Sequence, residues 1–371
     1  MNKAEPDKNQ GKPRILIAPL DWGLGHATRC ILLINELLAG GADVWLAGDG
    51  AREELLKQEF PSLPFLPLAG YRVQYARSAA GLVWKMARQT PRLLKAIKRE
   101  HQWLKDAVHQ YGFAAVISDN RYGLHHPGIT SIFITHQLRI KTPLPGFIEN
   151  WLQQKNYHYI NRFSACWVPD SPLAGGLAGE LSHPHHKPSV PVEYIGPLSR
   201  FSRKEVVPEK HRLLIILSGP EPQRTLFESI LLKEIQEYDG NICFVRGLPG
   251  EANEIPATEK VTFYNHLSAA RLNDEMLKAE YVIGRSGYST VMDLAALQKK
   301  SILIPTPGQT EQEYLGRYLF ENKKAITVQQ HRFCLQSALA EAAAFPYNLP
   351  EPPSASVLKE AVTRLLNSLR K

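Results

Sequence analysis

The chain has 371 residues, which is long enough for two domains of ordinary size, each with its own core. Hydrophobic residues make up 44% and charged residues 22%, as is typical of a folded soluble protein. The net charge of +8 admits nucleic acid, anionic membranes or phosphorylated substrates as partners, and composition does not choose among them.

The sequence carries no signal for export or for membrane insertion. No apolar run reaches the roughly 18 residues that a spanning helix needs, and the polar start lacks the apolar segment of a signal peptide. The four cysteines are far apart and show no CxxC spacing, which favours buried free thiols in a reducing compartment. We therefore expect a cytoplasmic protein with a disordered tail at residues 1–12.

The first half of the chain alternates short apolar segments with helical ones. Residues 14–18 form an apolar run of the kind buried in a parallel sheet, and a glycine-rich turn and a helix from Thr28 to about Leu38 follow. Further strands are expected at residues 44–47, 114–118, 131–135 and 165–168. This alternation predicts a doubly wound α/β domain over residues 13–198.

The second half repeats this plan after a charged segment at residues 199–211, which we interpret as an interdomain linker. A helix is expected from Arg224 onward. Strands are expected at residues 213–217, 242–245, 261–264, 281–283 and 301–304. The pattern predicts a second α/β domain over residues 212–371, whose last helix, near 357–369, can pack back on the first domain.

The turn Gly23-Leu-Gly-His26 lies between the first strand and the first helix. Its glycines let a ligand approach the backbone, and free N–H groups point outward at the helix start. An imidazole near the positive end of a helix is kept neutral more readily, which suits a general base. We predict a catalytic role for His26, with a structural role as the alternative.

Polar residues follow two further strands of the first domain, in Ser118-Asp-Asn-Arg-Tyr-Gly123 and in Thr135-His-Gln137. Such clusters lie at the carboxyl ends of parallel strands, in the crevice where α/β proteins bind ligands. Asp119 is a second candidate for acid–base chemistry or for binding a hydroxyl group. A cap or turn role for Asp119 is equally compatible with the sequence.

The stretch with the most candidate ligand-binding residues lies in the second domain. An apolar strand ends at Gly284, and Arg285-Ser-Gly-Tyr-Ser289 leads at once into a helix; a second strand and helix repeat the plan about twenty residues later. Two strand ends that face two helix N-termini can hold phosphate and ribose. Asp293 can accept from a sugar diol, and Gln312 adds a neutral polar contact. The stretch predicts a nucleotide pocket.

The turn Ser218-Gly-Pro-Glu-Pro-Gln223 occupies the same place earlier in the second domain. Its prolines remove N–H donors, so the turn binds phosphate poorly by itself. Arg224 can supply the missing donors, and a rigid turn with a solvated arginine is the alternative.

A basic stripe recurs at helical spacing between residues 83 and 99. Its members are Lys85, Arg88, Arg92, Lys95 and Arg99. The stripe indicates either contact with an anionic membrane or polyphosphate, or an ordinary solvated basic face. The sequence also lacks an Asp-x-Asp pair, so we expect no metal ion, and no other cofactor is indicated.

Together these motifs resemble the GT-B glycosyltransferases of family 28. Gly23-Leu-Gly-His26 resembles the first glycine loop of that family, Gly196-Pro-Leu-Ser-Arg200 its interdomain segment, and the stretch from Arg285 to Asp293 its donor signature. The resemblance implies two Rossmann-like doubly wound domains facing a central cleft. Asp293 stands where the family usually has a ribose-binding glutamate, and Glu313 replaces the second of two glutamines, so the donor sugar stays open.

The resemblance also implies which residues bind the two substrates. The predicted donor-binding residues are Arg200, Gly219, Arg224, Arg285, Ser286, Gly287, Tyr288, Ser289, Asp293, Gln312 and Glu313. The predicted acceptor-binding residues are Gly23, Gly25, Asn120, Arg121 and His136.

The function implied is metal-independent, inverting transfer of a hexosyl or N-acetylhexosaminyl unit. The donor is a nucleotide diphosphate sugar, UDP-linked in the first instance, and the acceptor is a hydroxyl group on a lipid-linked or cell-envelope glycan. His26, or less readily Asp119, deprotonates that hydroxyl group. We expect peripheral contact with the inner face of a membrane and no nucleic-acid partner. The alternatives are a sugar-nucleotide epimerase on the same fold and a non-catalytic nucleotide-sugar-binding protein.

Overall fold

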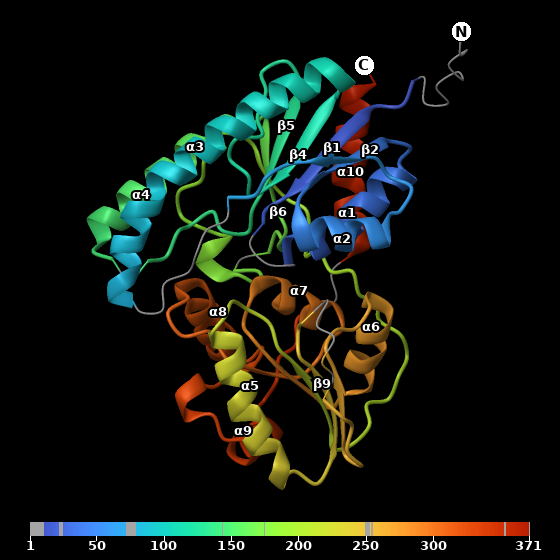
Figure 1. Cartoon of the computed structure of the whole chain (residues 1–371), viewed down its shortest axis with the longest axis vertical. Coiled ribbons are helices and arrows are strands. Elements are labelled where there is room, and N and C mark those ends of the chain that lie inside the picture. Colours follow the sequence, from blue (N-terminus) through green and yellow to red (C-terminus); the bar gives the residue numbers. More distant parts are fainter. Residues whose placement is uncertain are drawn as a thin grey trace.

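The computed structural model contains two parallel β-sheets stacked along the long axis of the molecule (Figure 1). It describes residues 11–21, 25–71, 79–142, 144–173, 175–248, 253, 255–351 and 354–370, with the backbone alone at residues 51, 79–89 and 355. The expectation of two α/β units with helices around parallel sheets is confirmed. The domain boundaries, including the linker at residues 199–211 and the tail at 1–12, stay predictions.

The first sheet has seven strands in the order β3-β2-β1-β4-β5-β6-β7. Its strands are β1 (Arg14–Pro19), β2 (Asp43–Gly48), β3 (Phe65–Pro67), β4 (Ala115–Asp119), β5 (Thr130–Ile134), β6 (Ala165–Val168) and β7 (Val192–Tyr194). The central strands are buried on both faces, which explains their continuous apolar runs. Pro19 pairs with Asp119 at the last step of the β1–β4 ladder, so both strands end at the same edge.

The second sheet has six strands in the order β10-β9-β8-β11-β12-β13. Its strands are β8 (Arg212–Ile216), β9 (Asn241–Val245), β10 (Val261–Tyr264), β11 (Tyr281–Gly284), β12 (Ser301–Leu303) and β13 (Ile326–Thr327). The short strands β3, β7 and β13 were absent from the sequence-based prediction. Two or three residues carry no readable period, and a neighbouring strand supplies the hydrogen bonds that define them.

Ten helices are described, together with three short 3₁₀ turns. The helices are α1 (Gly25–Ala39), α2 (Gly50–Glu59), α3 (Ala79–Tyr111), α4 (Gly146–Ile160), α5 (Gln223–Glu234), α6 (Ala269–Lys278), α7 (Tyr288–Ala296), α8 (Thr310–Glu321), α9 (Leu335–Ala344) and α10 (Ala355–Leu369). Figure 1 shows α7 and α8 on the side of the lower half that faces the upper half. The 3₁₀ turns are η1 (Gly179–Leu181), η2 (Ile235–Glu237) and η3 (Gln330–Arg332).

The last helix, α10, lies against α1 of the upper half (Figure 1). A Cβ atom on Gly40 would lie 2.4 Å from Leu366 Cδ1, so only glycine allows this approach. Arg370 Nη2 also donates to the carbonyl oxygen of Gly40 at 2.9 Å. The chain therefore returns across the first sheet after completing the second.

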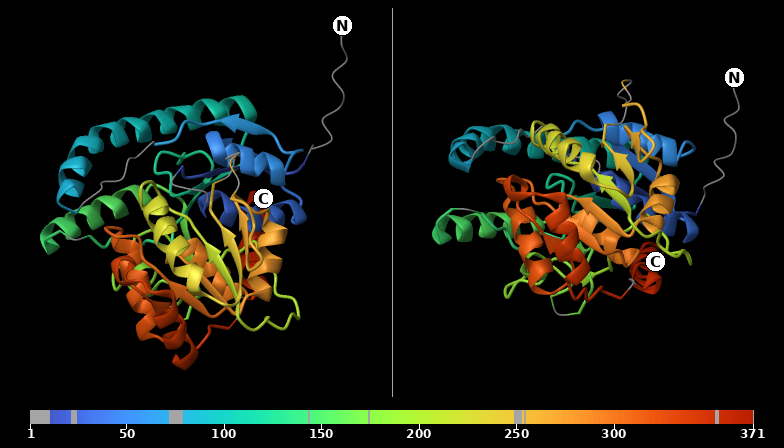
Figure 2. Two further views of the ribbon diagram at one scale, coloured as in Figure 1. Left: turned by 60° about the horizontal axis from the view of Figure 1, so that its bottom comes forward. Right: turned by 90° about the horizontal axis from the view of Figure 1, so that it is seen from below.

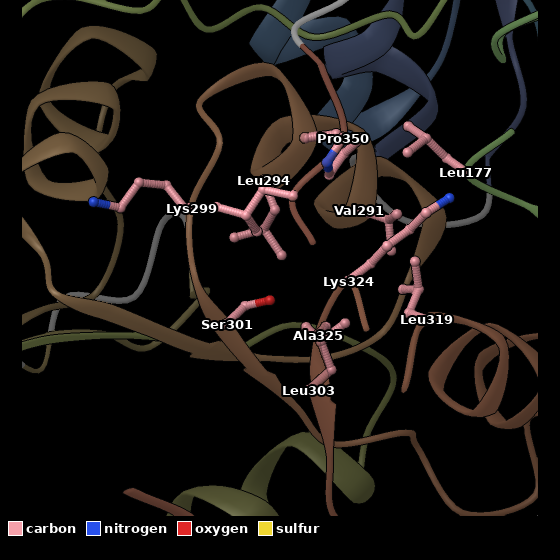
Figure 3. A pocket seen from close by; sticks show the side chains of 12 residues that line it. Leu177, Val291, Leu294, Lys299, Ser301, Leu303, Leu319, Lys324, Ala325 and Pro350 are labelled. Atoms are coloured by element: carbon pink, nitrogen blue, oxygen red, sulfur yellow. The ribbon is translucent and has the colours of Figure 1, made fainter. Parts of the chain in front are cut away.

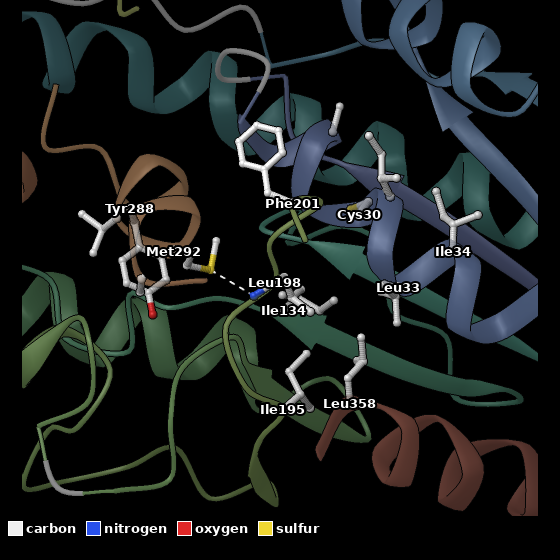
Figure 4. Close-up of a cluster of buried hydrophobic side chains, with 14 of the residues drawn as sticks. Cys30, Leu33, Ile34, Ile134, Ile195, Leu198, Phe201, Tyr288, Met292 and Leu358 are labelled. Carbon is white, nitrogen blue, oxygen red and sulfur yellow. Dashed lines mark hydrogen bonds between the residues drawn. The ribbon is translucent and has the colours of Figure 1, made fainter. Parts of the chain in front are cut away.

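A single cluster of buried apolar side chains joins the two halves. It includes Ile17 and Ile117 of the first sheet together with Leu214 and Val282 of the second. Figure 4 shows part of this cluster, where side chains of α1, β5 and α7 surround the crossing segment at residues 195–201. The backbone N–H of Leu198 donates to Met292 Sδ at 3.2 Å. The two halves are thus packed together, with the segment between them buried.

All four cysteines are free thiols, as expected. Cys30, Cys166 and Cys243 are buried, whereas Cys334 is only partly buried, so the expectation of burial is wrong for that residue. No described helix is long and apolar enough to cross a membrane. Helices α3 and α4 reach the same end of the molecule (Figure 2). Phe147 and Trp151 of α4 are 74% and 54% exposed there, which is unusual for side chains of this size.

Candidate active site

His26 lies in the first turn of α1, beside the carboxyl end of β4. Its Nδ1 atom is 3.1 Å from Asp119 Oδ1, and its side chain is 14% exposed. Within the described part of the chain, no hydrogen bond is formed by its other ring nitrogen, Nε2. The sheet register brings the two residues together from positions 93 apart in the sequence. The predicted catalytic pair is therefore assembled in one place.

A third residue, Arg29, completes this cluster. It lies one helical turn after His26, and its Nε donates to Asp119 Oδ2 at 2.7 Å while Nη2 donates to Asp119 Oδ1. The same Nη2 is 2.9 Å from His26 Nδ1. The sequence-based prediction missed Arg29, although the spacing of three residues within one predicted helix places both side chains on the same face.

Burial and charge give the members of this cluster different protonation states. Burial lowers the pKa of His26, Asp119 opposes this shift, and Arg29 adds to it, so the imidazole is neutral near pH 7. Burial alone would raise the pKa of Asp119, but Arg29 and His26 outweigh it and hold that pKa well below its usual range. A carboxylate so strongly held as an anion is a weak base. This geometry favours His26 over Asp119 as the proton acceptor.

The cluster continues into the second half of the chain. Arg29 Nη1 is 3.4 Å from His136 Nδ1, and the other ring nitrogen of His136 is 2.8 Å from Glu311 Oε1 in the first turn of α8. The ring of His136 also stacks on Tyr288, with centroids 4.1 Å apart and planes 9° from parallel. Glu311 was not among the predicted site residues, because only the packing of the halves shows what it faces.

The starts of α1 and α7 meet at Gly25. Ser289 Oγ donates to the carbonyl oxygen of Gly25 at 3.2 Å, and a Cβ atom on Gly25 would lie 2.7 Å from that Oγ. Glycine is therefore required for this approach. Two helix N-termini with positive dipole ends come together here, which favours an anionic ligand between the halves.

Asp293, predicted to bind ribose, lies one turn inside α7. Ser199 Oγ donates to its Oδ1 at 2.6 Å. Burial raises the pKa of Asp293 to about 6, although the Ser199 hydrogen bond and the charge of Arg200 oppose the shift. Burial lowers the pKa of Arg200, although the negative charge of Asp293 opposes this shift. Among the residues that the structure describes, the buried Nε of Arg200 has no hydrogen-bond partner. The structure thus brings Asp293 and Arg200 together, as the prediction requires.

Four more predicted donor residues converge at the ends of β8, β11 and β12. Ser286 Oγ donates to the backbone oxygen of Gln312 at 2.8 Å. A Cβ atom on Gly287 would lie 3.9 Å from Gln312 Nε2, and one on Gly219 would lie 3.7 Å from Thr306 Oγ1. Thr306, which the prediction missed, follows β12, and within the described part of the chain its buried hydroxyl has no hydrogen-bond partner.

Two arginines predicted to bind substrate donate to carboxylates of the protein instead. Arg121 is fully buried, and its Nε donates to Glu100 at 2.7 Å. Arg224 donates to Glu221 at 2.6 Å and to Glu228 at 3.0 Å. The structure therefore contradicts the prediction that these two residues contact substrate, because their donors already serve buried or local carboxylates.

Arg285 and Tyr288 also differ from the prediction. Arg285 is 1% exposed, its guanidinium lies 4.4 Å from the centre of the Phe227 ring, and it donates to backbone oxygens. Burial lowers the pKa of Arg285 to about 10. The Tyr288 hydroxyl donates to the carbonyl oxygen of Pro169 at 2.8 Å, which ties α7 to the first half. Both side chains contact backbone, and the buried Nε of Arg285 has no hydrogen-bond partner among the described residues.

The remaining predicted residues are either partly or fully exposed or lie outside the described part of the chain. Asn120 is partly exposed, with φ of 57°, and its N–H donates to the carbonyl oxygen of Ile134. The Glu313 side chain is exposed and accepts from the N–H of Gly308 at 3.0 Å. Gly23 lies outside the described residues, as do the side chains of Lys85 and Arg88 in the basic stripe.

A pocket lies beside α7 and is lined in part by Val291, Leu294 and Ala295 of that helix (Figure 3). Its lining is apolar apart from Ser301 and two lysines, and it contains none of the predicted site residues. The ammonium group of Lys299 donates to the backbone oxygens of Leu277 and Ala279, and burial lowers the pKa of Lys299 to about 8. Lys299 thus serves the end of α6, and we do not assign the pocket to catalysis.

Comparison with known proteins decides the class of this site. Residues 247–367 match the model of the glycosyltransferase family 28 C-terminal domain. Over 322 residues the chain is 22% identical to a Haemophilus ducreyi protein, the UDP-N-acetylglucosamine--N-acetylmuramyl-(pentapeptide) pyrophosphoryl-undecaprenol N-acetylglucosamine transferase, with 85% of each chain covered. The chain is a GT-B glycosyltransferase similar to family 28.

Solved structures support the same fold for this glycosyltransferase. Acinetobacter baumannii MurG superposes with a TM-score of 0.56 at 15% identity, covering 96% of this chain and 99% of the other. The glycotransferase of kitacinnamycin superposes with a TM-score of 0.60 at 14% identity, covering 97% and 96%. At this identity the likeness concerns the fold alone. It confirms the GT-B arrangement expected from the sequence.

Proposed function

We propose that this glycosyltransferase moves a hexosyl or N-acetylhexosaminyl unit from a UDP-linked sugar to a hydroxyl acceptor, with inversion at the anomeric carbon. The observation that carries the proposal is the position of His26, a neutral imidazole at a helix N-terminus that meets the start of α7. A base on one half of the molecule and a nucleotide pocket on the other are what transfer between two bound substrates requires.

The donor side is assigned to the second half. Asp293 would accept hydrogen bonds from the ribose diol, and Arg200 would face the diphosphate with its unused Nε donor. Ser286, Gly287 and Gly219 would let backbone approach the phosphates at the strand ends. Gln312, with Glu313 beside it, is placed for hydroxyl groups of the donor sugar, and Ser289 for the region between the two helix starts.

The proposed reaction is a single displacement. The acceptor hydroxyl loses its proton to His26 Nε2 as its oxygen forms a bond to the anomeric carbon of the donor. The bond from that carbon to the diphosphate oxygen breaks at the same time, and its electron pair leaves on the diphosphate. The N-terminus of α7 and Arg200 would offset the negative charge that develops there. Asp119 would stabilise the imidazolium that forms.

The acceptor is assigned to the first half, around Gly25, Asn120 and His136. A lipid-linked acceptor is proposed because the Haemophilus ducreyi relative is named for transfer to a pyrophosphoryl-undecaprenol compound. The exposed aromatic side chains of α4 and the exposed Arg92, Lys95 and Arg99 of α3 support contact with an anionic membrane surface. We propose peripheral association at the cytoplasmic face of a membrane.

The test has two steps. Purified protein is first screened for thermal stabilisation by UDP-N-acetylglucosamine, UDP-glucose, UDP-galactose, GDP-mannose and dTDP-glucose, because a ligand that binds only the folded state raises Tm. The best donor is then incubated with an undecaprenyl-pyrophosphoryl acceptor and membrane vesicles. Release of the nucleoside diphosphate with a glycosylated lipid product supports the proposal. An interconverted sugar nucleotide would identify an epimerase, and binding with no turnover would identify a sensor; either outcome overturns the proposal.

A further inference from the structure

Arg29 stands between the proposed base and its carboxylate partner. One guanidinium nitrogen, Nη2, contacts Asp119 Oδ1 and also lies 2.9 Å from His26 Nδ1. The carboxylate already accepts from Arg29 on both oxygens before it meets the imidazole. The site is therefore a three-membered cluster in which a cation and an anion compete for the same ring nitrogen.

This competition decides which nitrogen of His26 can act as a base. A guanidinium only donates hydrogen bonds, whereas a carboxylate only accepts them. When Nδ1 carries the proton it donates to Asp119, and Nε2 is free to take a proton from the acceptor hydroxyl. When Nδ1 accepts from Arg29, Nε2 carries the proton and cannot act as the base. The position of Arg29 thus sets the tautomer of His26.

The position of Arg29 depends in turn on the second half of the chain. His136 Nδ1 accepts from Arg29 Nη1 only if its proton lies on Nε2, and that nitrogen faces Glu311 at 2.8 Å. The two contacts are consistent with one tautomer of His136. Tyr288 stacks on the ring and fixes its plane. Glu311 precedes Gln312, the residue proposed to meet the donor sugar, so the chain of contacts begins beside the donor.

We propose that Arg29 and Glu311 are positioning residues for the general base. The contacts Glu311–His136–Arg29–Asp119 orient the guanidinium so that its Nη2 atom is shared between Asp119 Oδ1 and His26 Nδ1, and they join the start of α8 to the base while the two halves are packed together. His26 can then keep its proton on Nδ1 and act as a base through Nε2 in the arrangement in which donor and acceptor meet. This inference rests on the proposed function, because it assumes that His26 Nε2 receives the acceptor proton.

The two positioning residues carry opposite charges, so their removal has opposite effects. The titratable groups that act on His26 are Asp119, Arg29, His136 and Glu311, while Cys30 and Tyr288 act on Arg29. Arg29→Gln removes a cation beside the imidazole and frees the Asp119 carboxylate, and both changes favour the imidazolium. Glu311→Gln removes an anion and weakens the contact that orients Arg29, so that the guanidinium can donate fully to His26 Nδ1, and both changes disfavour the imidazolium.

The experiment follows His26 directly in the full-length protein. Protein labelled with ¹⁵N in histidine is titrated from pH 5 to pH 9, and the imidazole ¹⁵N shifts report the pKa and tautomer of His26, assigned with His26→Gln. The same variants are assayed for UDP release from UDP-N-acetylglucosamine across this pH range. Matched controls are Arg317→Gln and Glu321→Gln, which change exposed residues of α8. Arg29→Lys keeps the charge without the planar fork if Arg29→Gln folds poorly.

We expect Arg29→Gln to raise the pKa of His26 by about one unit or more, in line with loss of a neighbouring charge. We expect Glu311→Gln to lower that pKa, to increase the tautomer protonated at Nε2 and to reduce kcat while KM for the donor changes little. The acid limb of kcat should move with the ¹⁵N titration in each variant, and neither control should move it.

Two failures can be told apart. In the first failure, His26→Ala abolishes UDP release, but Arg29→Gln and Glu311→Gln shift the pKa of His26 in the same direction or leave it unchanged. The positioning role is then wrong, while His26 remains assigned as the general base. If His26→Ala releases UDP at the wild-type rate, the base assignment in the proposed function fails, and the positioning inference falls with it whatever the ¹⁵N titration shows.

Discussion

The two halves of the site hold their charged side chains in different ways. At the end of the first sheet, His26, Arg29 and Asp119 contact one another, so their charges are balanced locally. At the end of the second sheet, Arg285 donates to backbone oxygens, and the buried Nε atoms of Arg200 and Arg285 have no partner among the described residues. This difference fits the proposed function, in which the first half controls a proton and the second half binds an anionic ligand.

Burial acts on both halves but with different consequences. It disfavours the charged form of any group, and so it lowers the pKa of His26 and raises that of Asp293 to about 6. The imidazole is thereby kept as a neutral base near pH 7. The pKa of Asp293 is brought close to neutral pH. The affinity of the second half for the donor should therefore depend on pH in mildly acidic solution.

The largest expected effect tests the chemical half. His26→Ala should reduce turnover by about 10² to 10⁴, the usual contribution of a general base, and leave the affinity for UDP-N-acetylglucosamine unchanged. Steady-state UDP release and calorimetry measure the two quantities. His331→Ala, at an exposed histidine in the second half, is the control. A loss of donor affinity in His26→Ala would contradict the division of labour between the halves.

The donor half is tested by Asp293→Ala. Loss of hydrogen bonds to a charged group costs about 1.5–3 kcal/mol, so affinity for UDP-N-acetylglucosamine should fall roughly 10- to 100-fold. Calorimetry measures the affinity, and Asp274→Ala, at an exposed partner of Lys204, serves as the control. Wild-type affinity in Asp293→Ala would show that the nucleotide pocket lies elsewhere.

The contact between the halves is tested by Gly25→Ala. The added Cβ would lie 2.7 Å from Ser289 Oγ, so the starts of α1 and α7 must move apart. Overpacking of this kind costs about 1–3 kcal/mol, and we expect kcat to fall about tenfold. The control Gly146→Ala, whose added Cβ would meet no atom within 4 Å, should keep wild-type turnover. If the single variant is fully active, close approach of the two helices is not needed for turnover.

The smallest effect concerns pH. The Asp293 carboxyl is ionised above its raised pKa of about 6, and the ionised form accepts hydrogen bonds from a ribose diol on both oxygens and more strongly than the neutral form. Affinity for UDP-N-acetylglucosamine should therefore be full near pH 7 and fall roughly fourfold by pH 5.5, as linkage to one group requires. Asp293→Asn should remove this dependence. An unchanged dependence in that variant would assign the titration to another group, such as His266 beside Arg200.

Local signals in the sequence predicted the elements that carry the site. Uninterrupted apolar runs indicated β1, β4, β8 and β11, because strands buried on both faces carry no polar alternation. The strand ends then located His26, Asp119, Ser286 and Asp293. Arg29 was within reach of the same reasoning, since its spacing from His26 places both on one helical face.

Arginine roles were predicted least well. Arg121 lies fully buried in an ion pair with Glu100, and Arg224 lies between Glu221 and Glu228. A basic residue at a strand end looks the same in sequence whether it faces a ligand or a buried carboxylate. The distinction depends on a partner from another part of the chain, and pairing at 21 residues' separation, as in Arg121 and Glu100, leaves no local trace.

The sequence by itself determined two parallel sheets, the residues at their carboxyl ends and the likeness to family 28, because these depend on short-range patterns of apolar residues, glycine and charge. Only the tertiary structure decided which of these residues meet. Glu311 reaches His136 across 175 positions, and Ser289 reaches Gly25 across 264. Contacts of this kind arise from the packing of the two halves around a shared apolar cluster, and no periodicity in either partner encodes them.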